Sequence, residues 1–269
     1  MTRAHGLPAP SPTSYAVVTG ASQGIGKAMA TDLAKMGYNT ILVARREAVL
    51  ESIAAELRGF GVESEAFAAD LSDAADVDRL IARMGELEVT ILINSAGIAS
   101  FGKFMDQDWD YETKQFALNG TAVHRLTRAA LEQMLPRRRG AICNVGSAAG
   151  NVSIPNNATY VFTKAGVNAF TEALHYELKD TGVTCTLLAP GPVRDAVVPE
   201  EEQSIVDKVV PDFLWTTYES CSAETLKAMA RNQRRVVPGP LSKLMNLAGQ
   251  VVPTPIAAPV IGSFYAKMA

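Results

Sequence analysis

The chain has 269 residues, of which 48% are hydrophobic and 20% are charged, a composition typical of a soluble globular domain. With 25 Lys and Arg against 28 Asp and Glu the formal net charge is −3, so the sequence offers no basic field and nucleic-acid binding has no electrostatic support. The three cysteines follow no CxxC or metal-ligand spacing, which predicts buried free thiols and no metal site.

Residues 1–14 contain Pro and Ser but no apolar core, so they do not predict a secretory signal, and we expect them to be flexible. No stretch approaches the ~18 apolar residues that a membrane span requires. We therefore expect a cytoplasmic protein with a single domain over residues 15–269.

A β-rich stretch over residues 15–19 leads into Gly20, Gly24 and Gly26, and a helical pattern follows through residue 36. This is the context of a dinucleotide site, because glycines let the backbone approach a ligand and a helix N-terminus offers free amides to a pyrophosphate. The spacing is G-x-x-x-G-x-G rather than the commoner G-x-G-x-x-G, and a plain strand-to-helix connection is the alternative.

A second buried strand over residues 39–44 ends at Arg45 and Arg46, about where NAD-binding proteins carry an acid for the ribose 2′-hydroxyl. Guanidinium is instead the natural partner of a 2′-phosphate. The pair predicts NADPH/NADP+ as the cofactor rather than NADH/NAD+. A solvated charge pair that opens the next helix is the alternative.

The alternation of strands and helices continues to residue 188. We expect helices over 48–58, 74–84 and 109–135, and a further helix that contains Tyr160 and runs to residue 179. Strands are expected over 64–68, 89–93, 141–145 and 183–188. Such alternation predicts right-handed βαβ units and therefore an α/β fold, a Rossmann-type doubly wound parallel sheet flanked by helices.

Tyr160 and Lys164 are four residues apart, which on a helix places the phenol and the ammonium on one face. A cation beside a phenol favours the phenolate, so we expect Lys164 to lower the Tyr160 pKa. Ser147 follows a buried strand, at the edge where open α/β sheets bind their ligands. The alternative for the pair is an ordinary helix with a half-buried Tyr and a Lys that reaches solvent.

Taken together, these motifs resemble the short-chain dehydrogenase/reductase family over residues 15–193, in the family's order and spacing. Thr19 and the three glycines resemble its cofactor turn, Asp70 its adenine contact, residues 94–97 its Asn-Asn-Ala-Gly motif with Ser95 in second place, and Pro190-Gly191 the motif under the nicotinamide. The resemblance assigns the catalytic tetrad to Asn119, Ser147, Tyr160 and Lys164. Individually, Asn119 could be a polar mid-helix residue, Asp70 a helix cap and Asn94 a turn residue.

The resemblance implies an oxidoreductase that moves a hydride between nicotinamide and a carbonyl or secondary alcohol. Tyr160 would be the general acid, Lys164 would also bind the nicotinamide ribose, Ser147 would hold the substrate oxygen, and Asn119 would fix the helix and a proton-relay water. A cofactor-binding sensor or scaffold without turnover is the alternative. The expected cofactor-binding set is Gly20, Ser22, Gln23, Gly24, Ile25, Gly26, Arg45, Arg46, Asp70, Leu71, Asn94, Ala96, Gly97, Tyr160, Lys164, Pro190, Gly191 and Val193. Val193 stands near where the family usually has a Thr that touches the carboxamide.

Beyond residue 193 the shared pattern ends. We expect a substrate lid over residues 192–232, with apolar positions between 199 and 214, a helix over 223–229 and a last strand over 235–237. The lid and an apolar tail over 241–269 favour a lipophilic substrate (fatty-acyl, steroid-like or long-chain), with a small polar carbonyl as the alternative. The tail's apolar stripe lacks flanking basic residues, so we expect it to pack on a second subunit of a homodimer or homotetramer rather than on a membrane surface. The stripe consists of Leu241, Leu244, Met245, Leu247 and Ala248.

Overall fold

The computed structural model describes residues 6–191, 193–194 and 215–239, together with residues 242, 243, 246, 255, 258 and 259. The predicted lid positions between 199 and 214 and the predicted apolar stripe of the tail lie outside these residues.

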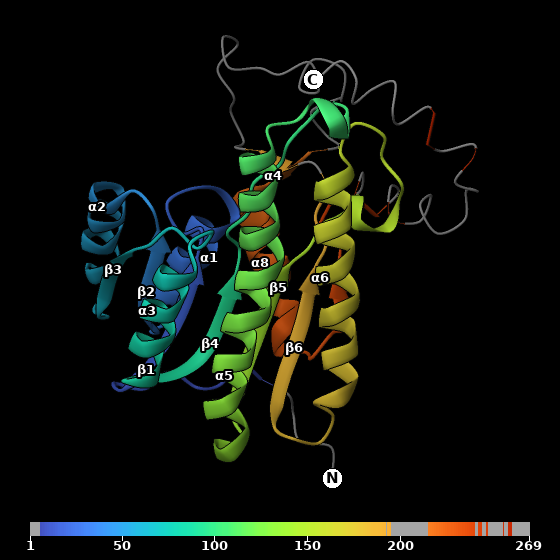
Figure 1. Cartoon of the computed structure of the whole chain (residues 1–269). Helices are drawn as coiled ribbons and strands as arrows, with labels where there is room; N and C mark the ends of the chain where they lie inside the picture. Colours follow the sequence, from blue (N-terminus) through green and yellow to red (C-terminus); the bar gives the residue numbers. More distant parts are fainter. Residues whose placement is uncertain are drawn as a thin grey trace.

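The centre of the molecule is a seven-stranded parallel sheet with the strand order β3-β2-β1-β4-β5-β6-β9 (Figure 1). This confirms the predicted Rossmann-type doubly wound sheet. The strands are β1 (Ser14–Thr19), β2 (Asn39–Ala44), β3 (Ser64–Ala68), β4 (Glu88–Asn94), β5 (Gly140–Val145), β6 (Val183–Leu188) and β9 (Arg235–Val236). A separate two-stranded ribbon pairs β7 (Val193–Arg194) with β8 (Thr216–Thr217).

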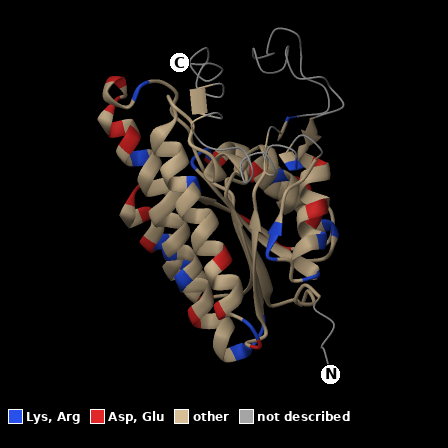
Figure 2. Ribbon diagram, turned by 90° about the vertical axis from the view of Figure 1, so that its right-hand side faces the viewer, with Lys and Arg blue, Asp and Glu red and all other residues tan. Residues whose placement is uncertain are grey.

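Helices cover both faces of the sheet and enclose two hydrophobic cores. One core holds the buried side chains of α1 (Gly24–Lys35), α2 (Glu47–Arg58) and α8 (Tyr218–Ala230). The other holds those of α3 (Ala74–Gly85) and α5 (Val123–Arg137), with Leu178 directly after α6 (Ala158–Glu177). The central strands β2, β4, β5 and β6 are buried almost throughout and therefore lack an apolar-polar alternation, whereas the edge strand β3 is mostly half-buried. Lys, Arg, Asp and Glu lie on the outer helices with both signs interspersed (Figure 2).

Helix α3 illustrates how the sequence sets a local element. Val77, Leu80 and Met84 recur at helical spacing and are its buried residues. Asp73 is the N-cap, and its carboxylate accepts from the amides of Ala75 and Asp76. The helix-cap alternative for Asp70 is therefore wrong, because the capping residue stands three positions later.

The helix predicted over residues 109–135 is continuous but not uniform. It consists of α4 (Trp109–Phe116), a π-helical segment (Ala117–Ala122) and α5. Asn119 lies in the π-helical segment, an irregularity that is frequent at functional sites.

The segment before β1 contacts the chain at the start of β2. The hydroxyl of Tyr38 donates to the Pro8 carbonyl over 2.5 Å, and the Asn39 amide donates to the Pro12 carbonyl over 3.0 Å. Cys143, Cys185 and Cys221 are buried free thiols, as predicted. Among the residues that the structure describes, no helix combines the length and the apolar character needed to cross a membrane.

The chain builds β1, β2 and β3 outward and then returns to place β4 on the other side of β1. In open α/β sheets such a reversal leaves a crevice at the carboxyl ends of the strands. The candidate site lies there.

Candidate functional site

A cleft of about 610 Å³ opens at the carboxyl ends of the strands. The predicted residues that line it are Gly20, Ser22, Gln23, Gly24, Ile25, Gly26, Arg45, Arg46, Asp70, Leu71, Ala96, Gly97, Tyr160, Lys164 and Pro190. Residues far apart in the sequence, from the first glycine turn to the Pro190 turn, thus form one concave surface.

The glycine turn after β1 requires glycine for steric reasons. Gly20 has φ of 68°, and a Cβ there would lie 2.9 Å from the Ala96 amide nitrogen. Thr19 fixes the facing loop, since its hydroxyl oxygen accepts from the amides of Ser95 (3.0 Å) and Ala96 (3.1 Å). The loops after β1 and β4 therefore approach each other closely below the cleft.

The first turn of α1 suits an anionic ligand. Its N-cap, Gln23, has an extended backbone and makes no side-chain cap hydrogen bond, which leaves the first amides of the helix for another acceptor. Gly26 lies against the backbone of Gly20, where a Cβ would be 2.4 Å from the carbonyl oxygen. This arrangement fits a dinucleotide pyrophosphate, because the glycines let the turn pack closely against the start of α1 while the first helix amides face the cleft.

The arginines at the end of β2 border the same cleft. The Arg46 guanidinium donates to Ser22 Oγ over 3.1 Å and to Gln23 Oε1 over 2.7 Å, so it lies beside the glycine turn. Arg45 acts on Asp70 through its charge. Arg45, Arg46 and Asp70 all line the cleft.

Asp70 is anionic at neutral pH. Burial opposes its ionisation, but hydrogen bonds from the hydroxyl and amide of Ser72 and the charges of Arg45 and Lys114 hold the pKa of this carboxyl below its usual value. A charged acceptor at this position fits the amino group of an adenine.

Tyr160 and Lys164 lie on one face of α6, as predicted, with the ammonium 5.8 Å from the centre of the phenol ring. Burial raises the pKa of the Tyr160 phenol, and a hydrogen bond with the Ser147 side chain lowers it in part. The prediction that Lys164 pulls this pKa below its usual value is therefore wrong, because desolvation dominates and the opposing contribution comes from Ser147. At neutral pH the phenol holds its proton and can donate it.

Lys164 is almost fully enclosed. Its ammonium donates to the Val145 carbonyl over 2.8 Å, and burial lowers the pKa of Lys164 to about 8. A Cβ on Gly97 would lie 3.4 Å from this nitrogen, so the ammonium is adjacent to the loop after β4. It can hold hydroxyl groups of a ligand between that loop and Tyr160.

Asn119 is completely buried and binds a loop rather than the cleft. Its amide nitrogen donates to the Ile98 carbonyl (2.8 Å), and its carbonyl oxygen accepts from the Ile98 amide (3.0 Å). A weaker bond of 3.3 Å reaches Thr163 on α6. Asn119 thus joins the π-helical segment, the loop after β4 and the helix that carries Tyr160.

Three predicted cofactor residues are not among the described residues that line the cleft: Asn94, Gly191 and Val193. The Asn94 amide is buried under the cleft and donates to Thr127 (3.1 Å) and Asn144 (2.9 Å), so its side chain is part of the core and not of a surface turn. The Gly191 amide donates to Ser242 Oγ over 3.0 Å. Val193 lies in β7.

Sequence reasoning missed several lining residues. Ser95 lies within the motif at residues 94–97, and Val145 and Gly146 directly precede Ser147. Their position next to predicted site residues could therefore have identified them. Tyr218, the first residue of α8, lies against Gly24, where a Cβ would be 3.5 Å from the Tyr218 ring. No local signal connects these two positions. The other missed lining residues are Val43, Ala44, Ala69, Ile98, Ala99 and Leu118.

The fold and the cleft together define a dinucleotide-binding α/β protein with Tyr160 and Lys164 in its site and Ser147 hydrogen-bonded to Tyr160. The sequence profile described as short chain dehydrogenase matches residues 14–205. The chain belongs to the short-chain dehydrogenase/reductase family of oxidoreductases.

Individual relatives agree with this membership. The chain is 35% identical over 209 residues to 3-oxoacyl-[acyl-carrier-protein] reductase from Staphylococcus aureus, covering 73% of this chain and 83% of that protein. It is 36% identical over 183 residues to 2,3-dihydro-2,3-dihydroxybenzoate dehydrogenase from Bacillus subtilis, covering 65% and 68%. Among solved structures, a short-chain dehydrogenase from Sphingobium yanoikuyae in complex with NADPH superposes with a TM-score of 0.75 at 30% identity, covering 83% of this chain and 87% of that one.

Proposed function

We propose that this protein is an NADP(H)-dependent oxidoreductase that interconverts a carbonyl compound and a secondary alcohol. The main support is that Tyr160 and Lys164 line the same cleft as the glycine turn, Arg45 and Arg46, and that Ser147 is hydrogen-bonded to Tyr160. When bound, the nicotinamide supplies or accepts the hydride.

The chain's own residues handle the proton and the oxygen. The phenol of Tyr160 keeps its proton at neutral pH and gives it to the substrate oxygen during reduction. Ser147 holds the same oxygen, since its hydroxyl already bonds to Tyr160. Lys164, when charged, stabilises the phenolate that remains after proton transfer.

The direct test is a panel of aldehydes and ketones with NADPH consumption as the readout. We expect at least one carbonyl compound to be reduced and the product alcohol to be oxidised with NADP+. Cofactor binding without turnover of any panel member would instead favour a sensor or scaffold that has kept the fold.

The cofactor preference is proposed to depend on Arg45 and Arg46. Replacing each with Ala should weaken NADPH binding by about tenfold or more and leave NADH binding nearly unchanged, because a charge-assisted contact with a 2′-phosphate contributes ~1.5–3 kcal/mol. Fluorescence titration with both reduced cofactors measures the change.

Arg128→Ala is the matched control. Arg128 is an exposed arginine on α5 that pairs with Glu132, so its replacement removes the same charge outside the cleft. Equal affinity of the wild-type protein for NADPH and NADH would contradict the proposal. So would an unchanged preference in both variants.

We further propose a lipophilic carbonyl substrate. Ile98, Ala99 and Leu118 give the cleft apolar lining, and the side chains of Phe104, Met105 and Trp109 after β4 are 50%, 85% and 68% exposed. The Staphylococcus relative is named for an acyl chain, which supports the same class. The Bacillus relative is named for a small polar ring, so the panel should include polar ketones beside ketones of increasing chain length. A specific activity that does not rise with chain length would contradict this class.

A homo-oligomer is proposed from an exposed aromatic pair on α4 and α6. Phe116 and Phe162 stack with ring centres 5.5 Å apart, yet they are 43% and 64% exposed. Replacing both with Gln should lower the sedimenting mass, because burial of such a pair in a subunit contact is lost. Phe60→Gln is the control, since Phe60 is equally exposed at the end of α2. A monomeric wild-type protein would contradict this proposal.

A further inference from the structure

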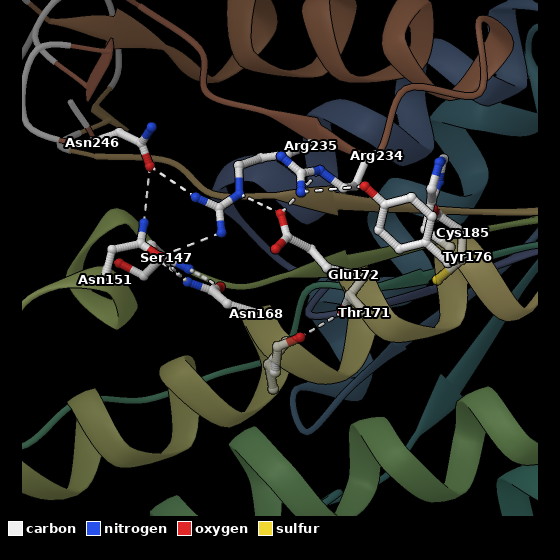
Figure 3. A network of polar contacts seen from close by, with 12 residues as sticks. Ser147, Asn151, Asn168, Thr171, Glu172, Tyr176, Cys185, Arg234, Arg235 and Asn246 are labelled. Atoms are coloured by element: carbon white, nitrogen blue, oxygen red, sulfur yellow. Dashed lines mark hydrogen bonds and ion pairs between the residues drawn. The ribbon is translucent and has the colours of Figure 1, made fainter. Parts of the chain in front are cut away.

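The Asn168 side chain forms hydrogen bonds with both main-chain groups of Ser147, its amide and its carbonyl. Its Nδ2 donates to the Ser147 carbonyl oxygen over 2.9 Å, and its Oδ1 accepts from the Ser147 amide over 3.3 Å. Asn168 is only 3% exposed and lies one turn beyond Lys164 on α6. Figure 3 shows its amide directed at the loop that carries Ser147.

The loop is built to admit this amide. A Cβ on Gly146 would lie 1.9 Å from Asn168 Oδ1, and a Cβ on Gly150 would lie 2.6 Å from its Nδ2. Glycine on both sides of the serine therefore leaves just enough room for the Asn168 side chain. A larger residue at either position would push the amide away from Ser147.

Other bonds fix the neighbours of Ser147 but not its own amide. Gly146 and Ala148 donate their amides to the carbonyls of Leu188 (2.8 Å) and Pro190 (2.9 Å). The Ser147 carbonyl also accepts from Gly150 at 3.1 Å, within a 3₁₀ turn (Ala148–Asn151). For the Ser147 amide, the described residues provide Asn168 as the acceptor.

The orientation of this peptide determines where the serine hydroxyl points. Ser147 Oγ accepts from the Ala149 amide over 3.1 Å and bonds to the phenol of Tyr160. Rotation of the Ser147 peptide would break this two-sided arrangement.

A polar network supports Asn168 from behind (Figure 3). Its Nδ2 lies 3.3 Å from Asn151 Oδ1, and Asn151 in turn donates to Asn246 over 2.9 Å. Arg235 donates to Asn246 (3.0 Å), to Asn151 (3.4 Å) and to Glu172 (2.8 Å) on α6. The serine loop is thereby connected to the last strand and to residue 246.

We propose that Asn168 is a positioning residue for the reaction, which sets the Ser147 peptide so that the serine hydroxyl meets the Tyr160 oxygen and the substrate oxygen. The inference rests on the proposed function, because it assigns to Asn168 an effect on the step that Ser147 assists. Asn119 pairs with both main-chain groups of Ile98 in the same way, so the two loops beside the cleft are each held by a buried asparagine.

The test replaces Asn168 with Leu, which has a similar size and no hydrogen-bonding groups, and with Asp, which keeps an acceptor for the Ser147 amide but turns a second acceptor toward the Ser147 carbonyl, so that both variants should be slow. We expect Asn168→Leu to lower kcat about 10²-fold, the scale of a misplaced reacting group, with the NADPH dissociation constant within twofold of wild type. Ser147→Ala combined with Asn168→Leu should be no slower than Ser147→Ala alone, because Asn168 acts through the serine. Amide hydrogen exchange at Ser147 and Ala149 should accelerate in Asn168→Leu, a readout independent of turnover.

Asn39→Leu is the matched control, since Asn39 is also buried and pairs with two main-chain groups, the Pro12 carbonyl and the Glu63 amide (3.0 Å each), at the start of β2. It should lower stability and leave kcat unchanged. A kcat of Asn168→Leu or, if that variant does not fold, of Asn168→Asp within threefold of wild type would overturn the inference, as would additive effects in the double variant. If Ser147→Ala alone keeps wild-type turnover, the proposed function fails instead.

Discussion

Tyr160→Phe is expected to reduce carbonyl turnover by about 10³-fold, within the range that a positioned general acid contributes. The change removes only the phenol oxygen, and the ring that packs beside Lys164 remains. NADPH binding should therefore stay close to the wild-type value. Steady-state kinetics on a carbonyl compound from the panel, with cofactor titration in parallel, measures both quantities.

The same variant has a distinct pH signature. Burial lowers the pKa of Lys164 to about 8 in the free protein, so its charge is present below that pH and lost above it. The Tyr160 pKa is raised, so the phenol keeps its proton across this range. Reduction by the wild-type enzyme should therefore slow above pH 8 as Lys164 becomes neutral, while Tyr160→Phe should be slow and nearly independent of pH. Unchanged turnover in Tyr160→Phe would show that the proton comes from elsewhere.

Gly26→Ala is expected to lower the melting temperature by about 2–12 °C and to weaken NADPH binding by at least tenfold. The added Cβ would lie 2.4 Å from the carbonyl oxygen and 2.7 Å from the carbonyl carbon of Gly20, and both are backbone atoms that cannot turn aside. Overpacking of this kind costs ~1–3 kcal/mol, and for a domain of this size each kcal/mol corresponds to about 2–4 °C. Displacement of the turn would also disturb the backbone geometry at which the pyrophosphate is proposed to bind. Thermal unfolding and cofactor titration test the two effects.

Gly85→Ala is the control for this prediction. Gly85 lies in α3 with no atom within 4 Å of an added Cβ, so alanine there should leave the melting temperature unchanged or raise it. If Gly26→Ala has the same melting temperature and NADPH affinity as Gly85→Ala, the prediction is wrong, and the close contact between α1 and the glycine turn does not require glycine at position 26.

Much of the fold could be predicted because its signals are local. The strand Ser64–Ala68 and the strand Val183–Leu188 were predicted to the residue, since a short buried β-rich stretch bounded by turn residues has few alternatives. The helix predicted over 223–229 begins earlier, at Tyr218, because Thr217 caps it by accepting from the Ser220 amide. The hydrophobic periodicity of residues 109–135 predicted a uniform helix and gave no sign of the π-helical segment around Asn119.

The candidate site divides in the same way. Local pattern made Ser147, Tyr160, Lys164 and the glycine turn candidates, because each stands at a strand end or at helical spacing, and the family resemblance in order and spacing then selected them. The burial of Asn94 beneath the cleft and the contact of Tyr218 with Gly24 were not accessible, since their partners come from distant segments.

The sequence by itself determined the order of strands and helices, the strand ends at which ligands bind and the residue types placed there, because these depend on periodicity and on the steric freedom of glycine. Only the tertiary structure decided the sign of the Tyr160 pKa shift, the desolvation of Lys164 and the hold of Asn168 on Ser147. The pKa of a side chain depends on desolvation by, and hydrogen bonds with, all the neighbours that the fold brings around it. The spacing of residues along the chain does not reveal those neighbours.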